Sequence, residues 1–63
     1  MKKYVIYKDA FGYKCTDENN YNSRIQDANK IITIKECYTM HDAVLTVKTW
    51  SKLTDDQIII KEV

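Results

Sequence analysis

The chain holds a single glycine and no proline, so one tight turn is marked more clearly than any other. Gly12 ends the segment DAFG, in which Asp9 suits the first turn position and the glycine can adopt a positive φ. The run 2–8 before it (KKYVIYK) is rich in β-branched and aromatic residues, and the run 13–16 after it (YKCT) alternates with a period of two. The sequence therefore predicts a β-hairpin over these residues.

Two further runs are typical of strands: KIITIKEC (30–37) and QIIIKE (57–62). Alternation divides the first into Ile32 and Ile34 on one face and Ile31, Thr33 and Cys37 on the other. In the second run Ile58 and Ile60 face opposite to Ile59. Since both strands carry apolar residues on both faces, we expect them to be central strands or to have a second covered face.

The segment between the hairpin and the third strand is polar. DENNYNS (17–23) predicts a loop with Tyr21 in its middle. SRIQ (23–26) matches a capping box, which predicts a short helical turn with Ile25 and Ala28 directed inward.

The stretch HDAVLTVKTW (41–50) can be interpreted as a strand or a helix. A strand would separate its apolar from its polar residues poorly, whereas a helix gathers its apolar residues on one stripe. That stripe consists of Met40, Ala43, Val44 and Val47, with Trp50 at its edge. Thr39 stands where an N-cap belongs, and Asp42 lies in the first turn, where negative charge is favoured. We therefore predict a helix over about 40–52, with Leu45 on the side away from the core.

These elements give the order β-β-β-α-β within a single small domain, residues 1–63. The predicted fold class is α+β, with one helix packed on one face of a small, mostly antiparallel sheet of three or four strands. A domain of this length buries a thin core and often adds a metal, a disulfide or a partner subunit. We expect a homodimer formed through the sheet face or a sheet edge.

Charge and apolar patterning argue against several function classes. Ten basic against nine acidic residues leave a net charge of +1, so no global field attracts nucleic acid or an anionic membrane. The sequence shows no signal peptide, and its longest apolar runs are too short to span a bilayer. We therefore expect a cytoplasmic protein whose Cys15 and Cys37 are reduced thiols.

No residue pattern of a catalytic, metal or cofactor site is present in the sequence. His41 and Asp42 are adjacent on a helix and point about 100° apart, so they do not form a general-base pair. Cys37 and His41 are four apart, but no C-x₂-C or H-x₃-H pair accompanies them. The carboxylate pairs 17–18 and 55–56 fall in predicted loops. We therefore predict a protein that is not an enzyme and has no cofactor or metal.

The residues that we expect to contact a partner protein are Leu45, Trp50, Tyr4, Tyr7 and Tyr13. Tyrosine and tryptophan are enriched in protein interfaces, and tryptophan is a frequent hot-spot residue. The predicted function is therefore a self-associating interaction module that binds, and could inhibit, another protein.

An alternative is a nucleic-acid-binding protein that uses the hairpin. Its tyrosines are interleaved with Lys2, Lys3, Lys8 and Lys14, and basic and aromatic residues on one sheet surface bind single strands by stacking and phosphate contacts. Arginine clusters and RNP-like motifs are absent, so this hypothesis stays second to protein binding.

The runs KKYVIYKDAFGYKC, IQDANKIITIKEC and MHDAVLTVKTW resemble the layout of small uncharacterised proteins from phages and prophages of AT-rich Gram-positive bacteria. The resemblance rests on pattern and composition and fixes no site. It implies an accessory protein, often dimeric, that binds and blocks a host protein in the host cytoplasm.

Overall fold

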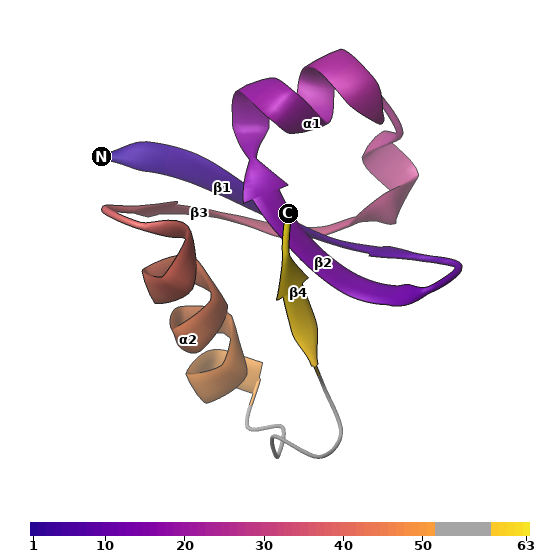
Figure 1. Cartoon of the computed structure of the whole chain (residues 1–63). Coiled ribbons are helices and arrows are strands. Elements are labelled where there is room, and N and C mark those ends of the chain that lie inside the picture. The colour runs from indigo at the N-terminus through magenta and orange to yellow at the C-terminus, as the bar shows by residue number, and fades with distance from the viewer. Residues whose placement is uncertain (52–58) are drawn as a thin grey trace.

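The computed structural model describes residues 1–51 and 59–63, and at positions 50 and 51 it describes the backbone alone. Four strands, two α-helices and one short 3-10 helix (η1) make up this part of the chain. In chain order they are β1 (Lys2–Asp9), β2 (Gly12–Asp17), α1 (Glu18–Arg24), η1 (Ala28–Lys30), β3 (Ile31–Cys37), α2 (Met40–Ser51) and β4 (Ile60–Glu62). The predicted α+β class is confirmed, with one helix more than expected (Figure 1).

The four described strands form one mixed sheet in the order β3-β1-β2-β4. The predicted hairpin is confirmed: β1 pairs antiparallel with β2 and, on its other side, with β3, so Ile6 lies opposite both Cys15 and Thr33. β4 adds to β2 in parallel, with Ile60 opposite Tyr13. The expectation of central positions for β3 and β4 is wrong, because both are edge strands within the described residues. Their mixed apolar pattern reflects the alternative, a sheet with helices on both faces.

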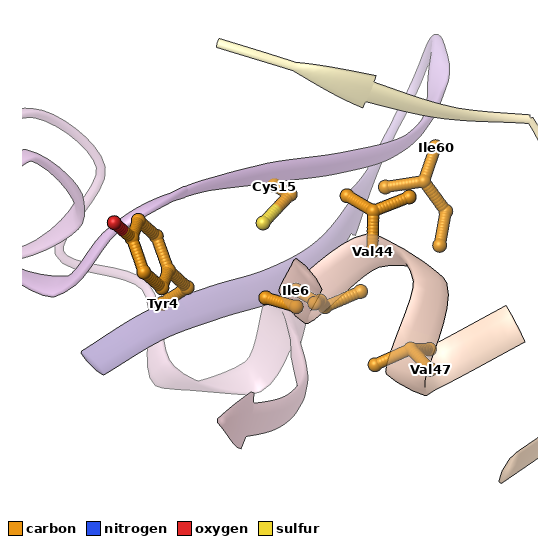
Figure 2. Packing of buried hydrophobic residues seen from close by; sticks show 7 residues of the cluster. Tyr4, Ile6, Cys15, Val44, Val47 and Ile60 are labelled. Carbon is orange, nitrogen blue, oxygen red and sulfur yellow. The ribbon is translucent and has the colours of Figure 1, made fainter. Parts of the chain in front are cut away.

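β1 is the strand on which both faces of the core depend, because its alternate side chains enter two separate clusters. Tyr4 and Ile6 face α2, whereas Val5 and Tyr7 face α1, and all four are buried. The α2 cluster contains Tyr4, Ile6, Cys15, Ala43, Val44, Val47 and Ile60 (Figure 2). The α1 cluster contains Val5, Tyr7 and Tyr21, with Ile25 and Ile31 packed against it. The two helices therefore lie on opposite sides of the sheet (Figure 1).

α2 forms where the apolar stripe predicted it. Ala43, Val44 and Val47 are buried against the sheet, and Met40 is half-buried beside them. The predicted cap is also confirmed, since the backbone N–H of Asp42 donates to the Thr39 hydroxyl at 3.1 Å. The β-branched residues are tolerated in this helix because they fall on its packed side, where burial outweighs a small loss of helix propensity.

α1 is the element that the sequence did not predict, and it replaces the expected loop over 17–23. Its N-cap is Asp17, whose carboxylate accepts the backbone N–H of Asn20 at 2.6 Å. Tyr21 is buried under this helix, and its ring meets that of Tyr7 edge-on with centroids 5.1 Å apart. The Tyr21 hydroxyl also donates to the carbonyl of Asp27, which ties α1 to the segment that follows it.

The capping box predicted at SRIQ is wrong, because the helix starts six residues earlier and ends there instead. Ile25 is the C-cap, and Gln26 adopts a positive φ of 55° that leaves the helical conformation. Ile25 is directed toward the α1 cluster as predicted, whereas Ala28 is exposed in η1. α1 begins at Glu18 because the Asp17 carboxylate caps its first turn and because Tyr21, one turn later, can be buried against the sheet.

A β-bulge in β3 changes the face assignment of its first residues. Thr33 lies opposite Ile6 and Ile31 lies opposite Tyr7, so Ile32 is an extra residue without a partner in β1. Ile31 therefore packs in the α1 cluster, although simple alternation had placed it on the same face as Thr33 and Cys37. Cys37 packs against the α2 cluster.

The Thr39 cap gives the first prediction. Thr39→Ala removes the acceptor for the Asp42 N–H and should lower the free energy of unfolding by about 1 kcal/mol, while Thr39→Ser should leave it nearly unchanged. Urea denaturation followed by circular dichroism measures both. Equal stability of the alanine and serine variants would contradict the capping role.

Candidate functional site

The outer side of β3 is an open sheet edge that exposes apolar side chains. β1 pairs with the inner side of β3, and within residues 1–51 and 59–63 no strand pairs with the outer side. Ile32 and Ile34 are 46% and 43% exposed, and Glu36 is exposed beside them. We call this surface, with the side chains of Ile32, Ile34 and Glu36, the β3 edge.

Successive side chains of β3 point to opposite faces of the sheet, and this determines which of them are exposed to solvent. Ile34 lies opposite Val5 in β1, so it stands on the α1 side of the sheet but beyond the area that α1 covers. Alternation from Thr33 places Ile32 on this same side. An edge strand also presents unpaired backbone N–H and C=O groups, which form a template for another strand. The β3 edge therefore combines backbone hydrogen-bonding groups with two apolar side chains.

Leu45 is also exposed, and it lies where the helical pattern predicted it. It is 47% exposed on the side of α2 away from the sheet, among His41, Lys48 and Thr49. A single leucine in polar surroundings is common on protein surfaces. The Trp50 side chain, the other candidate on this helix, lies outside the described residues.

The hairpin tyrosines occupy positions different from those expected for partner contacts. Tyr4 and Tyr7 are buried in the α2 and α1 clusters, so they present almost no surface to a partner. Burial raises the pKa of the Tyr7 hydroxyl above its usual value. Tyr13 is half-buried, and the Lys8 ammonium lies 5.3 Å from the centre of its ring. Tyr4 and Tyr7 belong to the core because β1 is covered on both faces.

The hairpin lysines do not form one basic surface. Strand alternation places Lys2 and Lys8 on the α2 side of the sheet, and Lys3 and Lys14 on the α1 side. The Lys14 ammonium lies 2.7 Å from the carboxylate of Asp9, and this contact lowers the pKa of Asp9. With Tyr4 and Tyr7 buried, the stacking platform that single-stranded nucleic acid needs is not assembled at the hairpin.

The polar residues considered for chemistry are dispersed. The exposed His41 imidazole Nδ1 lies 3.7 Å from a carboxylate oxygen of Glu62, and Asp17 is engaged as the α1 cap. In the described part of the chain, no three His, Cys, Asp or Glu side chains gather as a metal site would require. The pair 55–56 lies outside the described residues.

Cys15 and Cys37 are both free thiols on the α2 side of the sheet. Cys15 is fully buried, and this burial, with smaller contributions from Glu62 and Cys37, raises its pKa to about 11. A thiol with so high a pKa is neutral at pH 7 and is a poor nucleophile and metal ligand. Cys15 therefore acts as a small apolar core residue.

One open hollow of about 180 Å³ lies where the start of β1 meets the start of α1. Its lining residues are Lys2, Lys3, Asp17, Glu18 and Asn19. Pockets for small molecules are larger and mostly apolar, whereas this hollow is lined by polar and charged side chains. It gives no argument for a ligand.

Among the described residues, no helix is both long enough and apolar enough to cross a membrane.

Comparisons of the chain with protein-family models, with curated proteins and with solved structures gave no match. The function is therefore inferred from the geometry of the chain itself, and the β3 edge is the feature that carries the inference.

The β3 edge was not among the sites predicted from the sequence. Ile32 and Ile34 were recognised as one face of a strand, but the pattern could not show that this strand lies at an edge. One feature of the sequence could have indicated this surface. The run 30–37 is apolar on both faces, and a chain of 63 residues has too few residues to cover both of them fully.

Burial of Cys15 gives the second prediction. Its thiolate fraction should be about 100-fold lower than that of an unperturbed thiol, since its pKa rises from 9.0 to about 11. In the variant Cys37→Ala, a thiol reagent at pH 8 should therefore label Cys15 slowly in the native state and rapidly in urea. The variant Cys15→Ala is the matched control for Cys37, which is half-buried. Rapid native labelling of the Cys37→Ala variant would contradict the buried, protonated state.

Proposed function

We propose that this chain is a small non-enzymatic interaction module that binds protein by strand addition at the β3 edge. In this mode an extended segment pairs with the open strand, main-chain hydrogen bonds supply affinity, and side-chain contacts supply specificity. The observation that carries the proposal is a seven-residue edge strand whose outer side has no partner strand among the described residues and which exposes two isoleucines on one face.

The two edges of the sheet differ in their suitability for this role. β4 has three residues, of which Lys61 and Glu62 are exposed and charged. Short, charged strands are a common means of protecting an edge from pairing. β3 is longer and exposes isoleucine at two alternate positions, so it is the better template of the two.

The chemistry of β3 also describes the partner strand. It should be extended, with apolar side chains on the side that meets Ile32 and Ile34, and with a basic group within reach of Glu36. The small phage accessory proteins that the chain resembles often act by binding a host protein. A host protein in the cytoplasm that offers such a strand would fit this proposal, and binding there would block its own use of that strand.

Matched variants of Ile34 and Leu45 give the third prediction. The two side chains are almost equally exposed, at 43% and 47%, but only Ile34 belongs to the β3 edge. Ile34→Lys should reduce partner capture from host-cell extract at least tenfold, because a charge on an apolar strand face opposes pairing. Leu45→Lys should reduce it less than twofold, as expected for a surface residue outside the interface.

Quantitative mass spectrometry of proteins retained by the tagged chain measures capture, and circular dichroism shows whether each variant is folded. Capture that survives Ile34→Lys and is lost with Leu45→Lys would move the interface to α2. The absence of any protein that distinguishes the wild-type chain from the Ile34→Lys variant would contradict binding of a host protein through this edge.

A further inference from the structure

We infer that the groove between β2 and α2 is a binding site for an extended segment of another protein, and that β4 occupies it as a tethered ligand. The segment lies parallel to β2 and carries an apolar residue followed, two positions later, by an acidic one. In the strand order β3-β1-β2-β4, this site lies at the other end of the sheet from the β3 edge. The inference therefore goes beyond the proposed function and does not depend on it.

β4 shows what the groove accepts, because it lies there in the structure. Its three residues pair in parallel with β2, with Ile60 opposite Tyr13. The backbone N–H of Val63 extends this contact and donates to the carbonyl of Cys15 at 2.9 Å. Addition of an extended segment to a sheet edge is a recurring mode of peptide recognition, in which main-chain hydrogen bonds supply affinity.

α2 contacts the occupant of the groove at two positions. Ile60 is 7% exposed and packs in the α2 cluster beside Val44 (Figure 2). Alternation brings Glu62 to the same side of the sheet, where its carboxylate lies 3.7 Å from the imidazole Nδ1 of His41. Lys61, between them, is exposed. The groove therefore selects an apolar residue and an acidic residue two positions after it, whereas the residue between them can vary.

The contacts that hold β4 are few, which lets another segment take its place. Of its three side chains, Ile60 alone is buried. The contact between His41 and Glu62 is exposed to solvent, and exposed pairs of this kind contribute little to stability. β4 also lies opposite only three of the six residues of β2, so a longer segment gains main-chain hydrogen bonds along this strand.

The groove needs an occupant, because without one it would expose part of the core. Cys15 is fully buried, and Val44 and Val47 are 4% and 5% exposed, all in the cluster that contains Ile60. Exposure of these side chains to water is unfavourable. Because β4 belongs to the same chain, its effective concentration at the groove is high. Only a segment that makes more contacts than β4 should displace it, and this requirement makes the site selective.

A variant that weakens β4 tests the site with a peptide of known chemistry. Ile60→Ser removes the apolar side chain that β4 buries and should open the groove to the synthetic peptide IIKEV, which repeats residues 59–63. The peptide should bind this variant at least tenfold more tightly than the wild-type chain, in which β4 competes from within the molecule. The matched control is the same peptide with serine at the position of Ile60, which should not bind.

A second pair of peptides tests the acidic position. With glutamine at the position of Glu62, the peptide should bind the Ile60→Ser variant about threefold more weakly, because it lacks the charge that meets His41. In the double variant His41→Ala/Ile60→Ser, the two peptides should bind equally. This comparison separates recognition of the acidic group from a general change in the fold, since both peptides meet the same protein.

Two-dimensional proton–nitrogen NMR spectra measure the affinity and locate the site. Addition of IIKEV to the Ile60→Ser variant should shift the amide signals of Tyr13, Lys14 and Cys15, which lie opposite β4, and leave those of β3 unchanged. Circular dichroism shows whether the variant is folded. If Ile60→Ser does not fold, the milder variant Ile60→Ala takes its place with the same expectation.

The outcomes decide between the groove and its alternatives. Shifts in β2 and α2 that require the apolar residue of the peptide support the groove, whereas shifts in β3 instead overturn it. A folded variant that does not bind IIKEV also overturns the inference, while capture of a host protein that depends on Ile34 would still support the proposed function. A wild-type chain that sediments at twice the mass of 7.5 kDa, and as one chain after Ile60→Ala, would make β4 of a second copy the occupant and overturn the assignment to another protein.

Discussion

Burial of β1 on both faces is the constraint on which the rest of the structure depends. Tyr4 and Ile6 require a cover on one side, and Val5 and Tyr7 require one on the other, so a chain of 63 residues must supply two helices. Each such side chain contributes on the order of 1.5–3 kcal/mol when it is fully buried. Because these two helices pack over the faces of β1, few of the described residues remain to cover the outer side of β3. Ile32 and Ile34 of β3 are exposed for this reason.

The parts of the fold that depend on local patterns could be predicted from the sequence. Gly12 and the alternation around it identify the hairpin, and Thr39 with the stripe at Val44 and Val47 identifies α2. α1 could not be predicted in this way, because its seven residues include a single buried side chain, Tyr21, whose ring needs Tyr7 as a neighbour. Helices this short owe their stability to tertiary contacts rather than to their own propensity.

How well each candidate surface could be predicted also depended on whether it is set by a local pattern or by contacts between distant segments. The outward position of Leu45 followed from helical spacing, whereas the β3 edge required the strand order, which pairings between distant segments decide. Hairpin tyrosines in a Tyr/Lys pattern suggest a surface, but Tyr4 and Tyr7 lie in the core because β1 is covered on both faces by helices.

The parallel pairing of β4 with β2 has a consequence for the order of folding. β1 and β2 are joined by a tight turn, so their contacts can form early, whereas Ile60 must reach Tyr13 from the opposite end of the sequence. Loop closure over such a separation has an entropic cost that local contacts do not have, and pairing of this kind is slow. A strand of three residues has few hydrogen bonds to hold it once it arrives. β4 should therefore be the last strand to dock and the first to exchange its amide hydrogens, while β1 between its two neighbours retains them longest.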